Sequence, residues 1–135
     1  MPFNAPMPVT CQANTKDWTF GRQAMMLSRE VLLNNILLNF STGCSNKVLV
    51  KIMLNGEVIA PNFSTICQMY PADPRGAGAA YFGDDVTYDI NIKRILKEND
   101  KLEVWYINDD PSNDRLVVAD CKFEIESATL NATSI

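Results

Sequence analysis

The chain has 135 residues, 47% of them hydrophobic and 21% charged, which predicts one globular domain with a core of its own. Its net charge is −4 and it contains no histidine, so the usual general base for a serine or cysteine nucleophile is missing. No apolar run reaches about 18 residues, and no membrane-spanning helix is predicted. These features disfavour an enzyme and favour a protein that binds or builds.

The charge is unevenly placed along the chain. Residues 1–70 carry a net charge of +2, whereas residues 71–135 carry −6. Nucleic acids and anionic membranes need clustered Lys and Arg, and the only such cluster, Lys93, Arg94 and Lys97, is followed at once by acidic residues. We therefore expect neither a nucleic-acid partner nor a membrane partner.

The N-terminal segment, residues 1–16, is predicted to be an extended arm outside the core sheet. It has no basic region typical of a secretory signal, and three prolines bias it toward extended geometry without backbone donors. These prolines are Pro2, Pro6 and Pro8. Phe3, Met7 and Val9 make the arm more apolar than a solvated tail, so we expect it to dock on a neighbouring subunit.

The first predicted strand of the domain is Asp17–Met26, in which Trp18 and Phe20 alternate with polar residues. The next segment, Glu30–Ser41, has apolar positions that suit a helix almost as well as a strand. Its β-branched residues and paired asparagines favour strands with a bulge.

A hairpin is predicted where Lys47–Leu54 meets Glu57–Ala60, because the intervening Asn55-Gly56 suits a turn in which both residues need positive φ. Residues 71–85 form a long loop rich in Gly, Ala and Pro.

The remaining elements alternate between strands and polar turns. They are a strand at Val86–Lys93 with strict period 2, a turn or single helical turn at Ile95–Asp100, a central strand at Lys101–Ile107, a polar turn at Asn108–Asp114 and a last strand at Arg115–Glu126.

Seven or eight short strands with regular turns predict an all-β fold, an antiparallel β-sandwich that is either jelly-roll-like or immunoglobulin-like. The sandwich would span residues 17–126, between the arm at 1–16 and a small polar tail at 127–135.

The four cysteines, Cys11, Cys44, Cys67 and Cys121, form no CxxC pair, and no histidine completes a zinc site. Reduced, buried thiols are the expectation, and Cys121 is in phase with the apolar residues of the last strand. Disulfides stay open as an alternative for an extracellular protein.

The polar turn at 108–114 contains five carboxylate or amide side chains, among them Asp109, Asp110 and Asp114. Calcium binds such oxygens, yet the spacing lacks the central glycine of the helix–loop–helix site, and a turn capped by Asp and Asn explains the same residues. We expect no metal and no cofactor, with calcium at this turn as the alternative. Asp84 and Asp85, together with Asp73, have as one interpretation an acid pair for glycoside or phosphoryl chemistry. Adjacent residues at a strand entrance point to opposite faces, so we interpret them instead as a charged strand cap.

Trp105 and Tyr106 are neighbours in a strand and must point to opposite faces. Either one of them lies in the core and the other on the outer face of the sheet, or a second layer buries both. An exposed Trp105 would be a candidate anchor for a glycan or a protein partner.

In general layout, the arm Pro2–Thr10, the loop Pro71–Asp85 and the sandwich Trp18–Glu126 resemble the small β-sandwich decoration or cement proteins of tailed-phage capsids. The resemblance implies a non-enzymatic virion protein that assembles in the host cytoplasm as an oligomer. It would bind capsid protein and copies of itself through its arm and an apolar sheet face. The anchors would be Phe3, Met7, Val9 and Trp105.

The alternative is a carbohydrate-binding or receptor-binding β-sandwich module. It would use exposed aromatic residues, such as Trp105, and calcium bound at Asp109–Asp114.

Overall fold

The computed structural model describes residues 2–61 and 80–125, and this part of the chain contains eight β-strands and no helix. The strands are β1 (Pro2–Cys11), β2 (Arg22–Met26), β3 (Val31–Phe40), β4 (Val48–Leu54), β5 (Glu57–Ala60), β6 (Val86–Leu96), β7 (Lys101–Asn108) and β8 (Arg115–Glu124). The predicted all-β class is confirmed.

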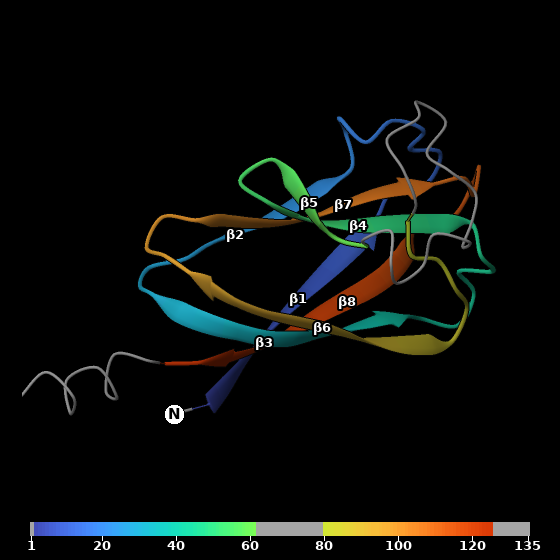
Figure 1. The fold of residues 1–135 in the computed structure, drawn as a ribbon. Coiled ribbons are helices and arrows are strands. Elements are labelled where there is room, and N and C mark those ends of the chain that lie inside the picture. Colours follow the sequence, from blue (N-terminus) through green and yellow to red (C-terminus); the bar gives the residue numbers. More distant parts are fainter. Residues whose placement is uncertain (1, 62–79, 126–135) are drawn as a thin grey trace, which may run out of the picture.

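The strands form two antiparallel four-stranded sheets that pack face to face (Figure 1). We call the sheet with the order β1-β8-β3-β6 sheet A and the sheet with the order β2-β7-β4-β5 sheet B. The predicted antiparallel sandwich is therefore confirmed. Strands from the two halves of the chain pair in reverse order (β1 with β8, β2 with β7, β3 with β6, β4 with β5), which is the strand arrangement of a jelly roll.

The core lies between the sheets and follows the period of 2 that the sequence shows. In β8, Val117, Ala119, Cys121 and Phe123 are buried, and the residues between them are more exposed. The predicted core position of Cys121 is confirmed. The strands β4 and β7 are central in sheet B and are buried on both faces over most of their length, as large apolar residues on both faces of Lys101–Ile107 predicted.

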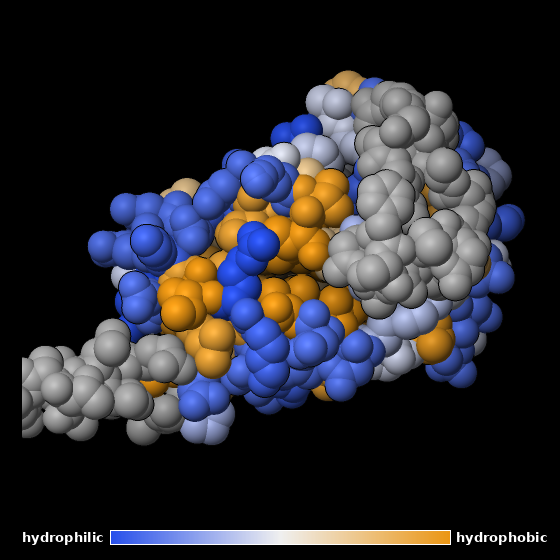
Figure 2. All heavy atoms as spheres, in the orientation of Figure 1, coloured by the Kyte–Doolittle hydropathy of each residue, from blue (hydrophilic) through white to orange (hydrophobic). Residues whose placement is uncertain are grey.

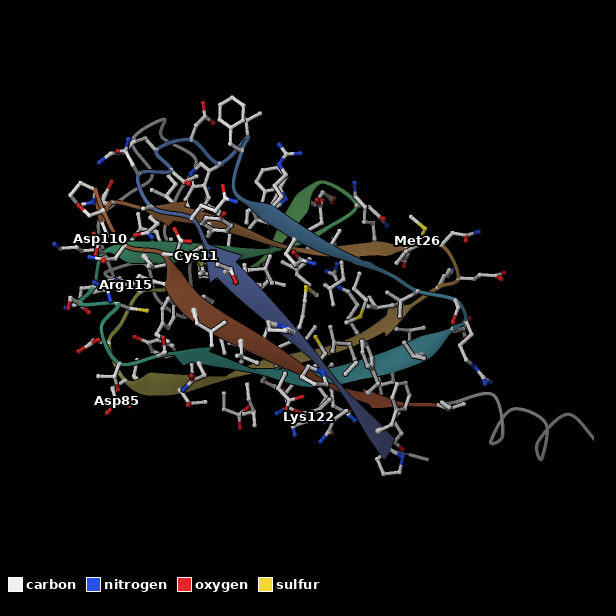
Figure 3. All side chains as sticks on the ribbon, turned by 180° about the vertical axis from the view of Figure 1, so that it is seen from behind. Cys11, Met26, Asp85, Asp110, Arg115 and Lys122 are labelled. Carbon is white, nitrogen blue, oxygen red and sulfur yellow. The ribbon has the colours of Figure 1, made fainter. Side chains whose placement is uncertain are left out.

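The two ends of the sandwich differ in their connections. At the hairpin end, the turn 55–56 has the predicted positive φ at both residues, 50° for Asn55 and 86° for Gly56. At the opposite end, which we call the loop end, the connections 12–21, 41–47 and 109–114 bond to one another. The N–H of Asn14 donates to the carbonyl of Asp110 at 2.7 Å. Figure 3 shows Asp85, Asp110 and Arg115 at the loop end and Met26 at the hairpin end.

The predicted N-terminal arm is wrong for Pro2–Cys11, because this segment is β1, an edge strand of sheet A paired with β8 along its whole length. The backbone groups of a central strand point alternately to its two neighbours. The N–H of Ser41 donates to the carbonyl of Leu116, so the even-numbered residues of β8 bond to β3 and the odd-numbered residues of β8 bond to β1. The odd-numbered residues of β8 are paired with odd-numbered residues of β1, for example Val117 with Val9. The three prolines are all even-numbered, so their missing donors face the open edge and cost no ladder bonds.

The first predicted strand of the domain begins later than expected. Trp18 and Phe20 lie in a turn, and β2 starts at Arg22. Trp18 is 2% exposed because it packs on the outer face of sheet B with Leu49 and Ile107. Trp18 and Phe20 were expected on the same face of a strand, but Trp18 is buried and Phe20 is exposed, so their alternation with polar residues did not reflect a strand.

The ambiguous segment 30–41 is β3, and the predicted bulge lies between Leu33 and Asn35. The same register shift explains why the predicted turn at 95–100 is wrong at its start. Two residues of β6, Ile92 and Lys93, lie there opposite Asn34 alone, and Lys93 has a φ of 53°. Beyond this bulge β6 continues to Leu96. Most of the predicted 71–85 loop and the tail at 127–135 lie outside the described residues.

Candidate interaction surface

Apolar side chains line the open side of the sandwich between β5 and β6. These two strands are edges of opposite sheets and lie next to each other at this side (Figure 1). We define the edge patch by four apolar residues of these two strands: Val58, Ile59, Ile92 and Ile95. Val58 pairs with Met53 and points to the outer face of sheet B, and Ile95 pairs with Leu32 and points to the outer face of sheet A. Val58 is 43% exposed and Ile95 54% exposed, while Ile59 and Ile92 are half-buried against the core. Figure 2 shows apolar surface running between the two edge strands.

One unpaired charge lies on each of these edge strands. Glu57 begins β5 and Arg94 lies near the end of β6, and both are exposed. Within the described residues neither side chain makes a hydrogen bond or an ion pair. Their neighbours on β6 are engaged, since Asp89 accepts from Asn35 at 2.8 Å and Lys93 donates to Asn34 at 3.1 Å. The edge patch therefore has an acidic residue on one strand and a basic residue on the other.

Three of the four predicted anchor residues lie in β1, and the structure separates them. Met7 is 4% exposed and Val9 is 1% exposed, so both belong to the core of this chain and offer no surface to a partner. Their predicted role as docking anchors is wrong, because pairing of β1 with β8 turns the odd-numbered side chains inward. Phe3 remains 38% exposed and stacks on Phe123, with a distance of 5.3 Å between the ring centroids.

Trp105 points to the outer face of sheet B, and Tyr106 points into the core. Trp105 is half-buried, and the guanidinium of Arg22 lies 3.9 Å from its ring centroid. Next to it, the Lys51 ammonium lies 4.5 Å from the Trp18 ring. The cation already on the Trp105 ring occupies the position that a stacked sugar or a partner side chain would take.

The polar turn at the loop end uses its carboxylates for internal hydrogen bonds. Asp110 accepts from the N–H groups of Ser112 and Asn113, and its other oxygen forms an ion pair with Arg115 at 2.7 Å. The Ser112 N–H, followed by the Arg115 guanidinium, lowers the pKa of Asp110.

The other two candidate calcium ligands bind elsewhere. Asp109 pairs with Lys16 at 3.1 Å, and Asp114 accepts from the N–H of Ala13 at 2.9 Å. Across residues 2–61 and 80–125, no group of three or more Cys, Asp or Glu side chains is arranged to hold a metal ion. The capped-turn interpretation therefore holds for Asp110, whereas Asp109 and Asp114 bind the neighbouring 12–21 connection.

Asp84 also acts as a cap. Its carboxylate accepts from the N–H groups of Ser45 and Gly43, which lower its pKa, with the Ser45 contribution first. The carboxylate therefore holds the 41–47 connection at the loop end. Asp73, the third acidic residue considered with Asp84 and Asp85, lies outside the described residues.

The cysteines Cys11, Cys44 and Cys121 are free thiols and fully buried. Burial raises the pKa of Cys121 to about 12, and it also raises the pKa of Cys11 and of Cys44. Protonated, buried thiols are poor nucleophiles and poor metal ligands. Cys67 lies outside the described residues.

Sequence reasoning missed the edge patch. Its residues appeared as ordinary apolar positions of two strands, and only the strand order shows that β5 and β6 are both edges and lie side by side.

No family model matches the sequence, and the search of curated proteins found no significant match. Among the described residues, no helix is long and apolar enough to cross a membrane.

Proposed function

We propose that the protein is a non-enzymatic structural subunit of a virion, a capsid decoration or cement protein that holds neighbouring subunits through the edge patch. The observation that carries the proposal is that both edge strands of the open side carry apolar residues that the core does not cover, Val58 and Ile59 on β5 and Ile92 and Ile95 on β6. Sheet edges of this kind are ready to pair with another chain.

The architecture supports the same role by analogy. Jelly rolls built from eight strands occur in viral capsid proteins and in lectins. Because one fold hosts many functions, this analogy only adds weight to the surface argument. The contact surface in this proposal is the edge patch and not the N-terminal segment, whose Met7 and Val9 belong to the core.

The test compares virions made with and without this protein. We expect purified virions to contain it, virions lacking it to be released or broken at lower temperature, and addition of the purified protein to restore their stability. A Val58→Asp/Ile95→Asp double variant should fold normally and fail to restore it. Leu116→Asp is the matched control, because Leu116 is 44% exposed but lies on β8, away from the edge patch.

Absence of the protein from purified virions would overturn the proposal. So would full restoration by the double variant, because the edge patch would then have no part in binding.

The alternative role, carbohydrate binding, has a specific feature in its favour. The indole N–H of Trp105 is buried without a hydrogen-bond partner, and this side chain is a partly exposed aromatic residue of the outer face of sheet B. Arg22 covers its ring, so binding would require Arg22 to move. Glycan-array binding that is lost in Trp105→Ala and strengthened in Arg22→Ala would favour this role over the structural one.

A further inference from the structure

The Asn55-Gly56 turn at the hairpin end brings two groups together that can react with each other. Asn55 is the only asparagine of the chain that precedes a glycine. Both residues are exposed, and a Cβ atom added to Gly56 would meet nothing within 4 Å. Within the described residues the N–H of Gly56 donates to no acceptor. With no side chain beside it, this backbone nitrogen is open to attack on the amide carbon of Asn55.

We propose that Asn55 is a site of spontaneous deamidation, at which the chain modifies itself as it ages. The nitrogen of Gly56 loses its proton and bonds to Cγ of Asn55. The Cγ–Nδ2 bond then breaks, and the departing nitrogen takes up a proton and leaves as ammonia. Water opens the resulting cyclic imide by breaking one of its two C–N bonds. The product is aspartate or isoaspartate at position 55, with one water consumed and one ammonia released.

Two hydrogen bonds hold the Asn55 side chain away from this reaction. Its Nδ2 donates to Oδ1 of Asp100 at 2.9 Å, and its Oδ1 accepts from the N–H of Lys101 at 2.9 Å. The backbone N–H of Asn55 also donates to the carbonyl of Lys101 at 2.9 Å, which binds the turn to the start of β7. The side chain must leave both partners before Cγ can reach the nitrogen of Gly56. The rate is therefore set by how often this contact opens.

The product does not fit the contact that held the amide. Deamidation replaces the Nδ2 donor by a carboxylate oxygen that faces Asp100. The Lys97 N–H, followed by the Asn55 amide, lowers the pKa of Asp100, so its carboxylate is charged at neutral pH. Two like charges at hydrogen-bond distance repel each other. Deamidation therefore acts as an irreversible timer that separates the turn at 55–56 from β7.

The rate is measured by peptide mapping with mass spectrometry during incubation at physiological temperature and neutral pH. Product should form at position 55 about tenfold more slowly than in a peptide of residues 50–60, because the folded chain must first break two hydrogen bonds. Asp100→Ala should accelerate the reaction at least about threefold, because the charged acceptor is gone.

Met7→Ala is the matched control for the rate. It weakens the core at Met7, on β1 of the other sheet, and leaves the contacts of Asn55 in place. It should therefore react at the wild-type rate. A thermal melt of each variant checks that the sandwich is folded.

An exchange of donor and acceptor tests the effect of the product. Asn55→Asp places the product carboxylate in the turn and should lower the urea midpoint. In Asn55→Asp/Asp100→Asn, the amide at position 100 donates to the carboxylate at position 55. Its oxygen remains free for the N–H of Lys97, which donates to Oδ2 of Asp100 at 2.8 Å. The double variant should therefore recover at least about half of the lost midpoint.

Four results would overturn the inference. The first is a folded protein without product at position 55 when the peptide has reacted completely, and the second is an Asp100→Ala variant that reacts at the wild-type rate. The third is equal acceleration by Met7→Ala, which would mean that the chain reacts only after global unfolding. The fourth is a double variant no more stable than Asn55→Asp, because the product carboxylate would then not act through Asp100.

Discussion

Asp110 links the polar turn of the loop end to the start of β8 through one side chain. Its carboxylate binds two N–H groups of its own turn and the guanidinium of Arg115, which lowers its pKa in the folded protein. A carboxyl group whose folded pKa is depressed stabilises the fold above its unfolded pKa of about 3.9, and this contribution is lost as the pH falls through the folded value. Acid should therefore loosen the loop end.

Asp110→Asn tests this contribution. We expect a lower urea midpoint than wild type at pH 7, and a smaller loss of midpoint between pH 5 and pH 2, because the titrating group is gone. Asp109→Asn is the control, since Asp109 forms only an exposed pair with Lys16. An equal effect of both substitutions would show that general charge, and not the Asp110 contacts, determines the acid sensitivity.

Gly21 is placed where no side chain fits. A Cβ atom added there would overlap with the backbone carbonyl oxygen of Tyr106. The backbone N–H of Tyr106 also donates to the carbonyl of Gly21 at 2.8 Å, which holds the two residues close together. The obstacle is backbone, which cannot turn aside, so Gly21→Ala should lower the free energy of unfolding by about 1–3 kcal/mol or more. Chemical denaturation measures the change.

Gly56→Ala provides the comparison. Gly56 has open space around it but a φ of 86°, so its cost arises from the backbone alone and should be about 1–2 kcal/mol. A Gly21→Ala variant as stable as wild type would contradict the close contact between Gly21 and the backbone of Tyr106.

At the scale of whole elements, β1 is the strand whose role differs most from the sequence expectation. The arm interpretation predicts that truncation of residues 1–10 leaves the sandwich folded. The structure predicts the opposite, because removal of β1 leaves the edge of β8 unpaired and uncovers the core at Met7 and Val9. A truncated protein with a native melting transition would contradict the edge-strand assignment.

Point substitutions in β1 separate the two faces of the strand. Met7→Ala should cost about 2–5 kcal/mol, because the side chain is buried in the core. Pro8→Ala should stay within about 0.5 kcal/mol, because Pro8 is exposed and its backbone faces the open edge. Denaturant midpoints of the two variants measure this difference directly.

The sequence predicted the elements whose signals are local. The alternation in 115–124, the Asn55-Gly56 hairpin and the bulge in 30–41 are patterns of neighbouring residues, and all three are present. It failed at β1 because proline forbids a central strand but not an edge strand, and the edges are a property of strand order. It also failed at Ile95, because the bulge at Lys93 moved the next residues out of phase.

The candidate surface was even less accessible to sequence reasoning. Val58 and Ile95 are 37 positions apart, and nothing local marks either as a surface residue. Trp105 was singled out for its chemistry, yet Arg22 on β2 covers its ring. Residue type identified a candidate anchor, whereas strand order determined which apolar residues are left uncovered.

For the molecule as a whole, the jelly roll leaves two open sides and protects each by different means. The side of β1 and β2 has a proline-bearing edge and a strand of five residues. The side of β5 and β6 has a strand of four residues with a bulge at Ile59, and a long strand with a bulge at Lys93. Prolines, short strands and bulges are the usual means by which proteins prevent unwanted pairing at sheet edges.

The buried thiols report on the integrity of the entire sandwich. Cys11 and Cys121 lie in β1 and β8, and Cys44 lies in the 41–47 connection, so no small local opening exposes all three. In a Cys67→Ser variant, these three are the only thiols of the chain. At pH 8 their labelling by iodoacetamide should be at least about 100-fold slower than that of an unfolded control, because raised pKa values and burial both suppress the thiolate.

Labelling should also follow global stability. Where reclosing is faster than modification, the rate tracks the population of the unfolded state, so a 2 kcal/mol destabilisation by Met7→Ala should accelerate it about 30-fold. The first label cannot be accommodated in the core, so it prevents refolding and the other two thiols react at once. Mass spectrometry of the time course would therefore show molecules with either no labels or three. Single labelling of Cys11 ahead of Cys121 would instead mean that β1 detaches by itself, and that the N-terminal strand is a separate unit of the fold.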